Sequence, residues 1–345
     1  MRSFLNNSIR LSTRKVSTGA ALVLLGAAIA SFSVESNASM VKSGFETGEF
    51  ESYGWRKSGN TPQVVQRPEP VCRGRYSLKI ALDRHKDGTS YRTELSLVGN
   101  EAGSLKNLKY EEDYWLGMSV FIPLSWKPDE KSTDILAQLH GVPDRDRNEI
   151  YRNPMFNFHI RGDEWFVITK RDSRAITATD RADMRYEEYG YRSLGKVEKG
   201  KWTNFVFHFR LSYRPGEGRI DVWKNGEKIV DNYKKGVGYN DKTGPYWKIG
   251  NYKPAWKPGH KPTAVTRRVH YVDEVSIARG ADRYEDVAPR CGDTSPPPRN
   301  EPQPPRSPAP DVPEPNPGKE PAPEPPMPSA QKPATPVIKQ VVVKE

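Results

Sequence analysis

The clearest pattern in this chain is a two-residue alternation of apolar and polar side chains, which is the periodicity of a β-strand. Within residues 204–211 every second position is phenylalanine or leucine, and residues 76–82 alternate in the same way. Asn225-Gly226 joins two further strand-like runs and is typical of a type I′ hairpin turn. No long run has the period of a helix. The pattern predicts an all-β protein, a two-sheet antiparallel sandwich built from many short strands.

Three of the predicted strands, residues 91–97, 135–140 and 246–252, separate polar from apolar side chains. Successive side chains of a strand point to opposite faces of its sheet. One face therefore gathers Arg92, Glu94, Ser96, Gln138, His140, Tyr246, Lys248 and Tyr252, and the other gathers Leu95, Leu97, Ile135, Ala137, Leu139, Trp247 and Ile249. On the polar face Gly250 leaves room for a ligand beside the backbone. This composition predicts the floor of a groove rather than a core.

A fourth predicted strand adds candidates for the same groove. Asn157, His159 and Arg161 alternate with apolar residues and share one face. Two charge-dense stretches, residues 141–153 and 171–193, do not fit the strand pattern, and we expect them to be loops over the groove, where binding function is often found. Their arginines are candidates either for contacts with an anionic chain or for a solvated loop surface: Arg145, Arg147, Arg152 and Arg174.

The two ends of the chain differ in composition from its middle. Residues 1–38 contain basic side chains followed by an apolar run of about 15 residues, which is typical of a secretory signal peptide and short for a membrane span. Cleavage after Ala30 and after Ala38 both fit, and an uncleaved anchor is the alternative. Residues 292–345 hold 18 of the 31 prolines and predict a disordered, extended tail, acting as a spacer or binding a partner module.

The domain between these ends, residues 39–291, carries most of the charge. Of the formal net charge of +11, this domain accounts for +9. A cationic domain favours an anionic partner, although a merely soluble basic surface has the same composition. The sequence contains no signature of a nucleic-acid-binding module, no HExxH zinc motif, no P-loop and no strand motif of paired glycosidase carboxylates. We therefore expect an anionic glycan rather than nucleic acid.

Cys72 and Cys291 are the two cysteines of the chain and flank almost the whole domain. An even pair of cysteines in an exported protein predicts a disulfide, and two buried free thiols are the alternative.

Three blocks on the polar face carry a specific resemblance. Arg92-Thr93-Glu94-Leu95, Gln138-Leu139-His140 and the run from Tyr246 to Tyr252 resemble the RTEL, Q-I-H and Y-F-K-x-G-x-Y blocks of jelly-roll alginate lyases. The flanking segments resemble the heparin lyase I and glucuronan lyase group: Gly44–Gly48, Trp202–Val206 and Val222–Gly226. Together the matches cover residues 44–278. The resemblance implies a concanavalin A-like β-jelly roll with a concave substrate groove.

The resemblance also implies a reaction, the β-elimination of a uronic-acid-containing polysaccharide to give unsaturated uronides. It assigns Arg92 and Gln138 to neutralising the substrate carboxylate and His140 with Tyr252 to acid–base catalysis, leaving open which of the two is the base. Lys248 is a cation that can lower the pKa of Tyr252, and Glu94 and Tyr246 are substrate-binding or orienting residues. The alternative is a lectin-like binder of anionic glycans without turnover.

Further expectations concern cofactors and partners. Lyases of the resembling group often hold a structural calcium, and Glu46 and Asp273 are candidate ligands here, whereas catalysis itself requires no cofactor. After the second tyrosine the chain has Lys253-Pro254 instead of the Asn-Gln of alginate lyases, and Lys253, Lys257 and Lys261 favour a strongly anionic chain. Glucuronan, another glucuronate-rich exopolysaccharide, alginate and a heparin-like glycan remain open, as does endo against exo cutting. We expect a secreted or periplasmic monomer.

Overall fold

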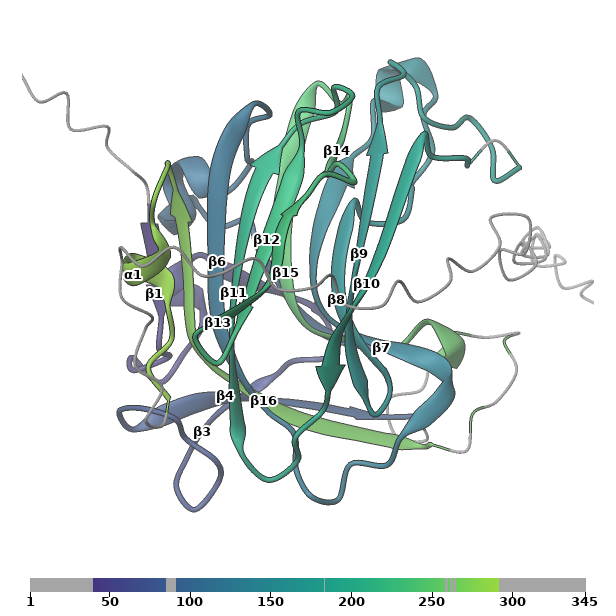
Figure 1. Ribbon diagram of the computed structural model, residues 1–345. Coiled ribbons are helices and arrows are strands. Elements are labelled where there is room, and N and C mark those ends of the chain that lie inside the picture. The colour runs from purple at the N-terminus through teal and green to yellow at the C-terminus, as the bar shows by residue number, and fades with distance from the viewer. Residues whose placement is uncertain are drawn as a thin grey trace, which may run out of the picture. The chain divides into compact units, whose positions relative to one another are not determined.

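Two β-sheets pack against each other across an apolar core in this computed structural model (Figure 1). The structure describes residues 40–84, 91–182, 184–257, 260, 263 and 265–291. The leader predicted at residues 1–38 and the proline-rich tail predicted at residues 292–345 lie outside these ranges. No helix in the described ranges has the length and apolar character needed to cross a membrane.

Each sheet has eight strands, and all strand pairs are antiparallel except that of β14 with β9. Sheet A contains, in spatial order, β13 (Glu227–Tyr233), β12 (Arg219–Lys224), β11 (Trp202–Leu211), β6 (Glu112–Phe121), β16 (Arg267–Arg279), β4 (Tyr76–Asp83) and β3 (Gln63–Gln66), with β1 (Met40–Ser43) paired to β16. Sheet B contains β10 (Glu188–Lys196), β9 (Glu164–Asp172), β8 (Phe156–Gly162), β7 (Asp129–Val142), β15 (Thr243–Tyr252), β5 (Arg92–Leu97) and β2 (Trp55–Gly59), with β14 (Gly238–Tyr239) paired to β9.

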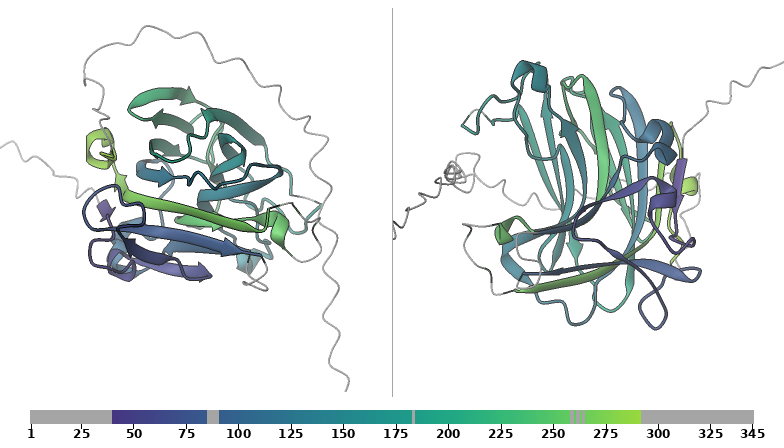
Figure 2. Two further views of the ribbon diagram at one scale, coloured as in Figure 1. Left: turned by 90° about the horizontal axis from the view of Figure 1, so that it is seen from below. Right: turned by 180° about the vertical axis from the view of Figure 1, so that it is seen from behind.

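Neighbouring strands often come from distant parts of the sequence, as β15 does between β5 and β7, and both sheets curl (Figures 1 and 2). This arrangement confirms the predicted β-jelly roll. Helical structure in the described ranges is limited to short pieces: η1 (Glu51–Tyr53), η2 (Asn100–Leu105), η3 (Arg145–Arg147), η4 (Pro254–Trp256) and α1 (Tyr284–Val287).

The core forms where the apolar faces of the two sheets meet. Phe205 and Phe209 of β11 are fully buried and lie with their ring centroids 4.7 Å from Phe158 and Phe156 of β8, respectively. Trp247 of β15 packs on Phe209 at 5.3 Å. Aromatic pairs at these distances add packing energy to the area that they bury. The apolar face predicted from the alternation in residues 204–211 is therefore confirmed.

Of two local predictions, the hairpin turn is confirmed and the alternation in residues 135–140 is partly wrong. The hairpin between β12 and β13 is confirmed, since Asn225 and Gly226 both have positive φ angles, 50° and 83°, as a type I′ turn requires. The simple alternation predicted for residues 135–140 is wrong at its start. A register shift lies between Ile135 and Ala137, and Leu136 joins the core. One inserted residue reverses the parity of the strand before it.

The two charge-dense stretches are only partly loops. Residues 141 and 142 still belong to β7, and the second stretch begins in β9 and ends in β10. Tyr189 and Tyr191 of β10 pair with Lys170 and Ile168 of β9. Backbone pairing at the edge of the sheet thus overrides the polar composition of these segments.

The predicted disulfide between Cys72 and Cys291 is confirmed, and its Cα atoms are 5.4 Å apart. It closes a loop with a sequence separation of 219 residues. In the chain-entropy description, a cross-link over a loop of this length stabilises the fold by about 5 kcal/mol.

Candidate active site

The polar face of sheet B is organised around β15, which lies between β7 and β5. Lys248 stands opposite Gln138 on one side and Ser96 on the other. Tyr246 stands opposite His140, whereas Tyr252 stands opposite Arg92. The strand register therefore brings all three sequence blocks to one face.

Glu94 holds the centre of this face. Its carboxylate accepts a hydrogen bond from Lys248 Nζ at 2.6 Å and another from Gln138 Nε2, and Arg92 Nη1 lies 3.5 Å from its Oε2. Glu94, Gln138 and Lys248 are only 1%, 2% and 3% exposed. Burial lowers the pKa of Lys248, and the charge of Glu94 opposes that shift. These three residues form a nearly enclosed layer beneath the surface of the face.

Four other side chains are more accessible than this layer and are placed to meet a ligand. The Arg92 side chain is 30% exposed, and His140, Tyr246 and Tyr252 are half-buried. The Arg92 guanidinium carbon lies 4.5 Å from the ring centroid of Tyr252. The strand parity read from the sequence identifies the face correctly, but it does not separate these accessible residues from the enclosed ones.

His140 is held in one tautomer. Its Nδ1 lies 2.9 Å from the backbone carbonyl oxygen of Gly141, and because a carbonyl only accepts hydrogen bonds, Nδ1 must carry the proton. Burial, together with the nearby cations Lys248 and Arg92, lowers the pKa of His140 to about 4. The imidazole is therefore neutral at neutral pH, with a lone pair on Nε2.

Both tyrosines on this face stay protonated at neutral pH. Burial raises the pKa of Tyr252, while the cations Lys257 and Arg92 oppose this shift. Burial also raises the pKa of Tyr246, whose ring centroid lies 5.6 Å from that of His140. The expectation that nearby cations lower the pKa of Tyr252 is therefore wrong. Such cations are present, but the loss of hydration raises this pKa by more than they lower it.

The strand β8 extends the polar face, although two of its three candidates are enclosed. Asn157 stands opposite Gln138, and its Oδ1 lies 2.8 Å from Nδ1 of His159. His159 is buried and stacks on Phe166, and burial lowers its pKa to about 3. Arg161 is exposed and donates from Nε to the backbone oxygen of Glu130.

The candidate calcium ligands serve as acceptors for backbone amides. Glu46 accepts from Arg75 N at 3.0 Å, and Asp273 accepts from Cys72 N at 3.0 Å and from Glu274 N at 2.7 Å. In the described ranges, no group of three or more His, Cys, Asp or Glu side chains is arranged to hold a metal ion. Both carboxylates are thus already engaged by backbone amides, and the calcium site stays a prediction.

Two of the basic residues singled out in the sequence are enclosed in ion pairs. Lys253 is fully buried, with Nζ 2.9 Å from Asp129 and 3.1 Å from Asp134. Arg152 is buried as well. Lys253 therefore offers no accessible charge to an anionic chain, whereas Lys257 lies beside Tyr252 and Lys261 falls outside the described residues.

The sequence analysis did not identify Tyr151 as a candidate site residue. It belongs to the loop after β7, so no strand parity marks it, yet its ring centroid lies 6.3 Å from that of His140.

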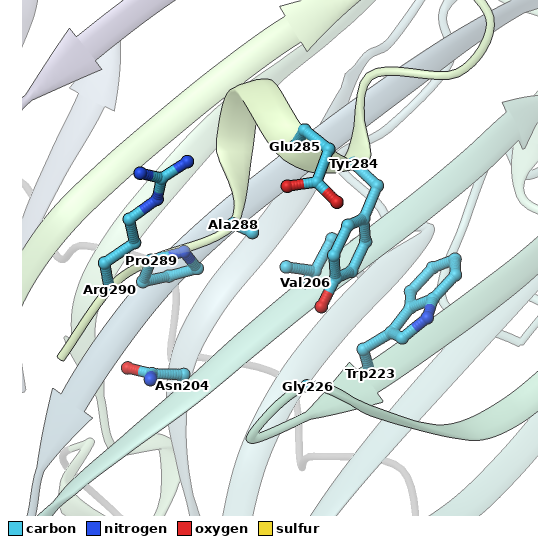
Figure 3. A pocket seen from close by; sticks show the side chains of 9 residues that line it. All are labelled: Asn204, Val206, Trp223, Gly226, Tyr284, Glu285, Ala288, Pro289 and Arg290. Atoms are coloured by element: carbon cyan, nitrogen blue, oxygen red, sulfur yellow. The ribbon is translucent and has the colours of Figure 1, made fainter. Parts of the chain in front are cut away.

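A shallow pocket lies elsewhere, on the face of sheet A that points away from the core (Figure 3). It is lined by Asn204, Val206, Trp223, Gly226, Tyr284, Glu285, Ala288, Pro289 and Arg290. Tyr284 packs against Trp223 with ring centroids 5.1 Å apart. None of the residues from the three sequence blocks lines this pocket, so it is separate from the polar face of sheet B.

Comparison with known proteins gives a family and a fold. A family model described as polysaccharide lyase matches residues 45–276. The crystal structure of an endo-β-1,4-glucuronan lyase from the fungus Trichoderma reesei is similar with a TM-score of 0.56 and 17% identity, covering 73% of this chain and 98% of that one. Alginate lyase A1-II′, a member of polysaccharide lyase family 7, gives a TM-score of 0.42 and 12% identity over 70% of this chain and 99% of that one. No curated protein sequence matches.

Proposed function

Because this chain belongs to the polysaccharide lyase family, we propose that it cleaves a uronic-acid-containing polysaccharide by β-elimination and releases unsaturated uronides. The observation that carries the proposal is the arrangement on sheet B, where Arg92, neutral His140 and two protonated tyrosines surround the buried Glu94–Lys248 pair.

The charge of this arrangement suits a carboxylate. Arg92 and Lys248 contribute two positive charges and Glu94 one negative charge, so an excess of positive charge remains for a ligand. In β-elimination the proton at C5 is hard to remove while the adjacent carboxylate keeps its charge. Stabilisation of the developing negative charge by oriented donors is often the largest contribution to catalysis. Arg92 offers a two-pronged donor that matches a carboxylate, and Gln138 has a second amide hydrogen beside its bond to Glu94.

The protonation states favour one division of labour. His140 Nε2 takes the C5 proton, the electrons of that C–H bond form the C4–C5 double bond, and the C4–O4 bond breaks. A tyrosine phenol then protonates the departing O4, and the proton held by His140 restores the phenol through solvent. A bound anionic substrate raises the proton affinity of His140 from its low value in the free protein. Since burial keeps both tyrosines protonated, each is better suited as the acid than as the base.

Two tyrosines are candidates for the acid. The resemblance assigns the role to Tyr252, which packs against Arg92. The register of β15 favours Tyr246, which stands opposite His140, whereas Tyr252 is six residues farther along the same strand. Curling of the sheet and the proximity of Arg92 to both rings support a shared site.

The remaining candidates have supporting roles. Glu94 orients Arg92, Gln138 and Lys248, and the enclosed Lys248 contributes charge from below. Asn157 and His159 support the neighbouring part of the face, and exposed Arg161 is available to a more distant sugar. No step uses a metal, because protein groups neutralise the carboxylate.

We also propose that the protein is exported and acts as a monomer on an anionic glycan outside the cytoplasm. The basic and apolar leader and the disulfide support export, since disulfides persist in oxidising compartments.

The test is a panel assay of the purified protein on glucuronan, alginate and heparin-like polymers. We expect ultraviolet absorbance to rise on at least one of them as the C4–C5 double bond forms. Tight binding to these polymers without product from any of them would instead support the lectin-like alternative.

A further inference from the structure

We propose that Tyr151 and Arg145 form a substrate-binding wall at the His140 end of sheet B, which holds a uronate unit next to the one being cleaved. This inference rests on the proposed function, because it assumes that an acidic glycan lies on the polar face. The loop between β7 and β8 supplies both residues. Tyr151 has no role in any motif or comparison, and Arg145 was until now one of four arginines with two alternatives open.

Tyr151 is placed like a binding residue rather than a core residue. The residue is 66% exposed although its side chain is large and aromatic. Its ring lies at 66° to the ring of His140, and it is close enough to Tyr246 to raise the pKa of that phenol. A glycan seated against His140 and Tyr246 therefore meets the Tyr151 ring where it leaves them.

Arg145 adds a positive charge to the same wall. Its guanidinium carbon lies 4.0 Å from the ring centroid of Tyr151, and Nη1 donates to the backbone oxygen of Glu149 at 3.0 Å. That carbonyl is neutral, so this bond leaves the charge of Arg145 available. The C–H groups of a sugar ring can pack on the phenol ring, and the guanidinium can pair with a carboxylate. The chemical class that fits is an acidic oligosaccharide extending beyond the cleaved bond.

The residue after Tyr151 anchors the loop. Arg152 is enclosed, with Nη1 2.8 Å from Glu149 and Nη2 2.7 and 2.6 Å from the two carboxylate oxygens of Asp241. Glu149 in turn accepts hydrogen bonds from the backbone amides of Asp144 and Thr177. The loop is thus fixed both to the segment before β15 and to the segment after β9. A wall held in this way needs little ordering when a ligand binds.

The experiment compares substrate kinetics of Arg145→Gln and Tyr151→Ala with those of the wild type, on the polymer that the panel assay identifies. We expect KM to rise about tenfold with kcat nearly unchanged, since a lost charged hydrogen bond weakens ground-state and transition-state binding alike. Tyr151→Phe keeps the ring and should behave as the wild type does.

Arg147→Gln is the matched control. Arg147 lies in the same short helix η3, but its guanidinium faces Asp144 at 3.7 Å, so its loss should leave KM unchanged. Unchanged KM in both Arg145→Gln and Tyr151→Ala, in folded protein that cleaves polymer, would overturn the wall. So would an equal rise in the Arg147→Gln control.

A binding measurement separates this inference from the proposed function. If the wild type cuts none of the polymers, the same variants are compared by calorimetric titration with acidic oligosaccharides of each polymer. Weaker binding by Arg145→Gln and Tyr151→Ala alone would retain the wall while the lyase function fails. Equal affinity of all variants, or no binding by any protein, would overturn the wall.

Discussion

His140 and the two tyrosines on the same face, Tyr246 and Tyr252, differ in which protonation state the protein stabilises. Burial disfavours the charged form of each, so it leaves the imidazole neutral and the phenols protonated. A single physical effect thereby prepares one group to accept a proton and its neighbours to donate one.

Phenylalanine substitutions should identify the acid. Tyr252→Phe and Tyr246→Phe each retain the ring and its packing and remove only the phenol hydroxyl. Loss of the general acid should lower kcat by about 10²–10⁴-fold in one variant, whereas the other should change mainly KM. Turnover measured by ultraviolet absorbance decides between them. Near-normal kcat in both variants would contradict a tyrosine acid.

The pH dependence of kcat/KM should be unusually broad. This quantity reports groups of the free enzyme. Because protonated His140 cannot act as a base, kcat/KM should fall as pH drops through about 4, the pKa of His140, rather than near 6.5. Because the pKa of both tyrosines is raised above the ordinary value of 10, their deprotonation should cause no loss of kcat/KM below pH 10. An earlier alkaline loss would instead report Lys248, whose pKa burial lowers. An acid limb near 6.5 in stopped-flow or initial-rate profiles would show that His140 is hydrated.

At the scale of elements, β15 determines the site because it places a buried ion pair between two neighbouring strands. Glu94 comes from β5, Lys248 from β15 and Gln138 from β7. The hydrogen bonds among them cross both strand boundaries.

Glu94→Gln should therefore destabilise the fold. It leaves the Lys248 ammonium buried without a counter-charge, and breaking a buried pair in this way costs about 3–5 kcal/mol. Urea unfolding followed by circular dichroism measures the change. The matched control is Glu101→Gln, whose pair with Arg56 is exposed on both sides and should contribute little. Equal stability of the two variants would show that the Glu94 pair is hydrated in solution.

The sequence was sufficient to predict the strands that carry the three motif blocks and which of their polar side chains share a face, because both follow from the two-residue period. It did not predict β10, whose residues are too polar for that period to show. How deeply each of the polar side chains is buried within the face was not predictable. Lys248 and Tyr252 have the same parity, but Lys248 is enclosed by Glu94 and its neighbours while Tyr252 lies nearer the surface. The burial of Lys253 was likewise hidden, because one of its partners, Asp134, is 119 residues away. Tyr151 carries no periodic signal, and only the folded loop brings it to His140.

At the scale of the whole molecule, the candidate active site and the disulfide are associated with different sheets. Sheet B carries the candidate active site, and Cys291 lies beside sheet A, where its Sγ contacts Ser119 of β6 at 3.1 Å. Changes at the disulfide should therefore act on stability more than on the site.

Replacing both Cys72 and Cys291 with serine should lower the free energy of unfolding by up to about 5 kcal/mol, because the unfolded chain regains the freedom of a long loop. Below the lowered melting temperature, kcat should stay close to that of the wild type. Calorimetric melting with and without reductant provides the measurement. Equal melting temperatures of the two proteins would mean that the disulfide does not reduce the conformational freedom of the unfolded chain.

The same bond determines how the domain responds to mechanical load. A pull on the segment after residue 291 enters at Cys291 and passes through the sulfur bridge to Cys72, from which it continues along the backbone toward the N-terminus. Residues 73–290 form a covalent loop outside this path, and they include every candidate catalytic residue from Arg92 to Tyr252. Tension on an anchored C-terminal tail would therefore not stretch the backbone that builds the active site, so the protein could keep cutting while tethered.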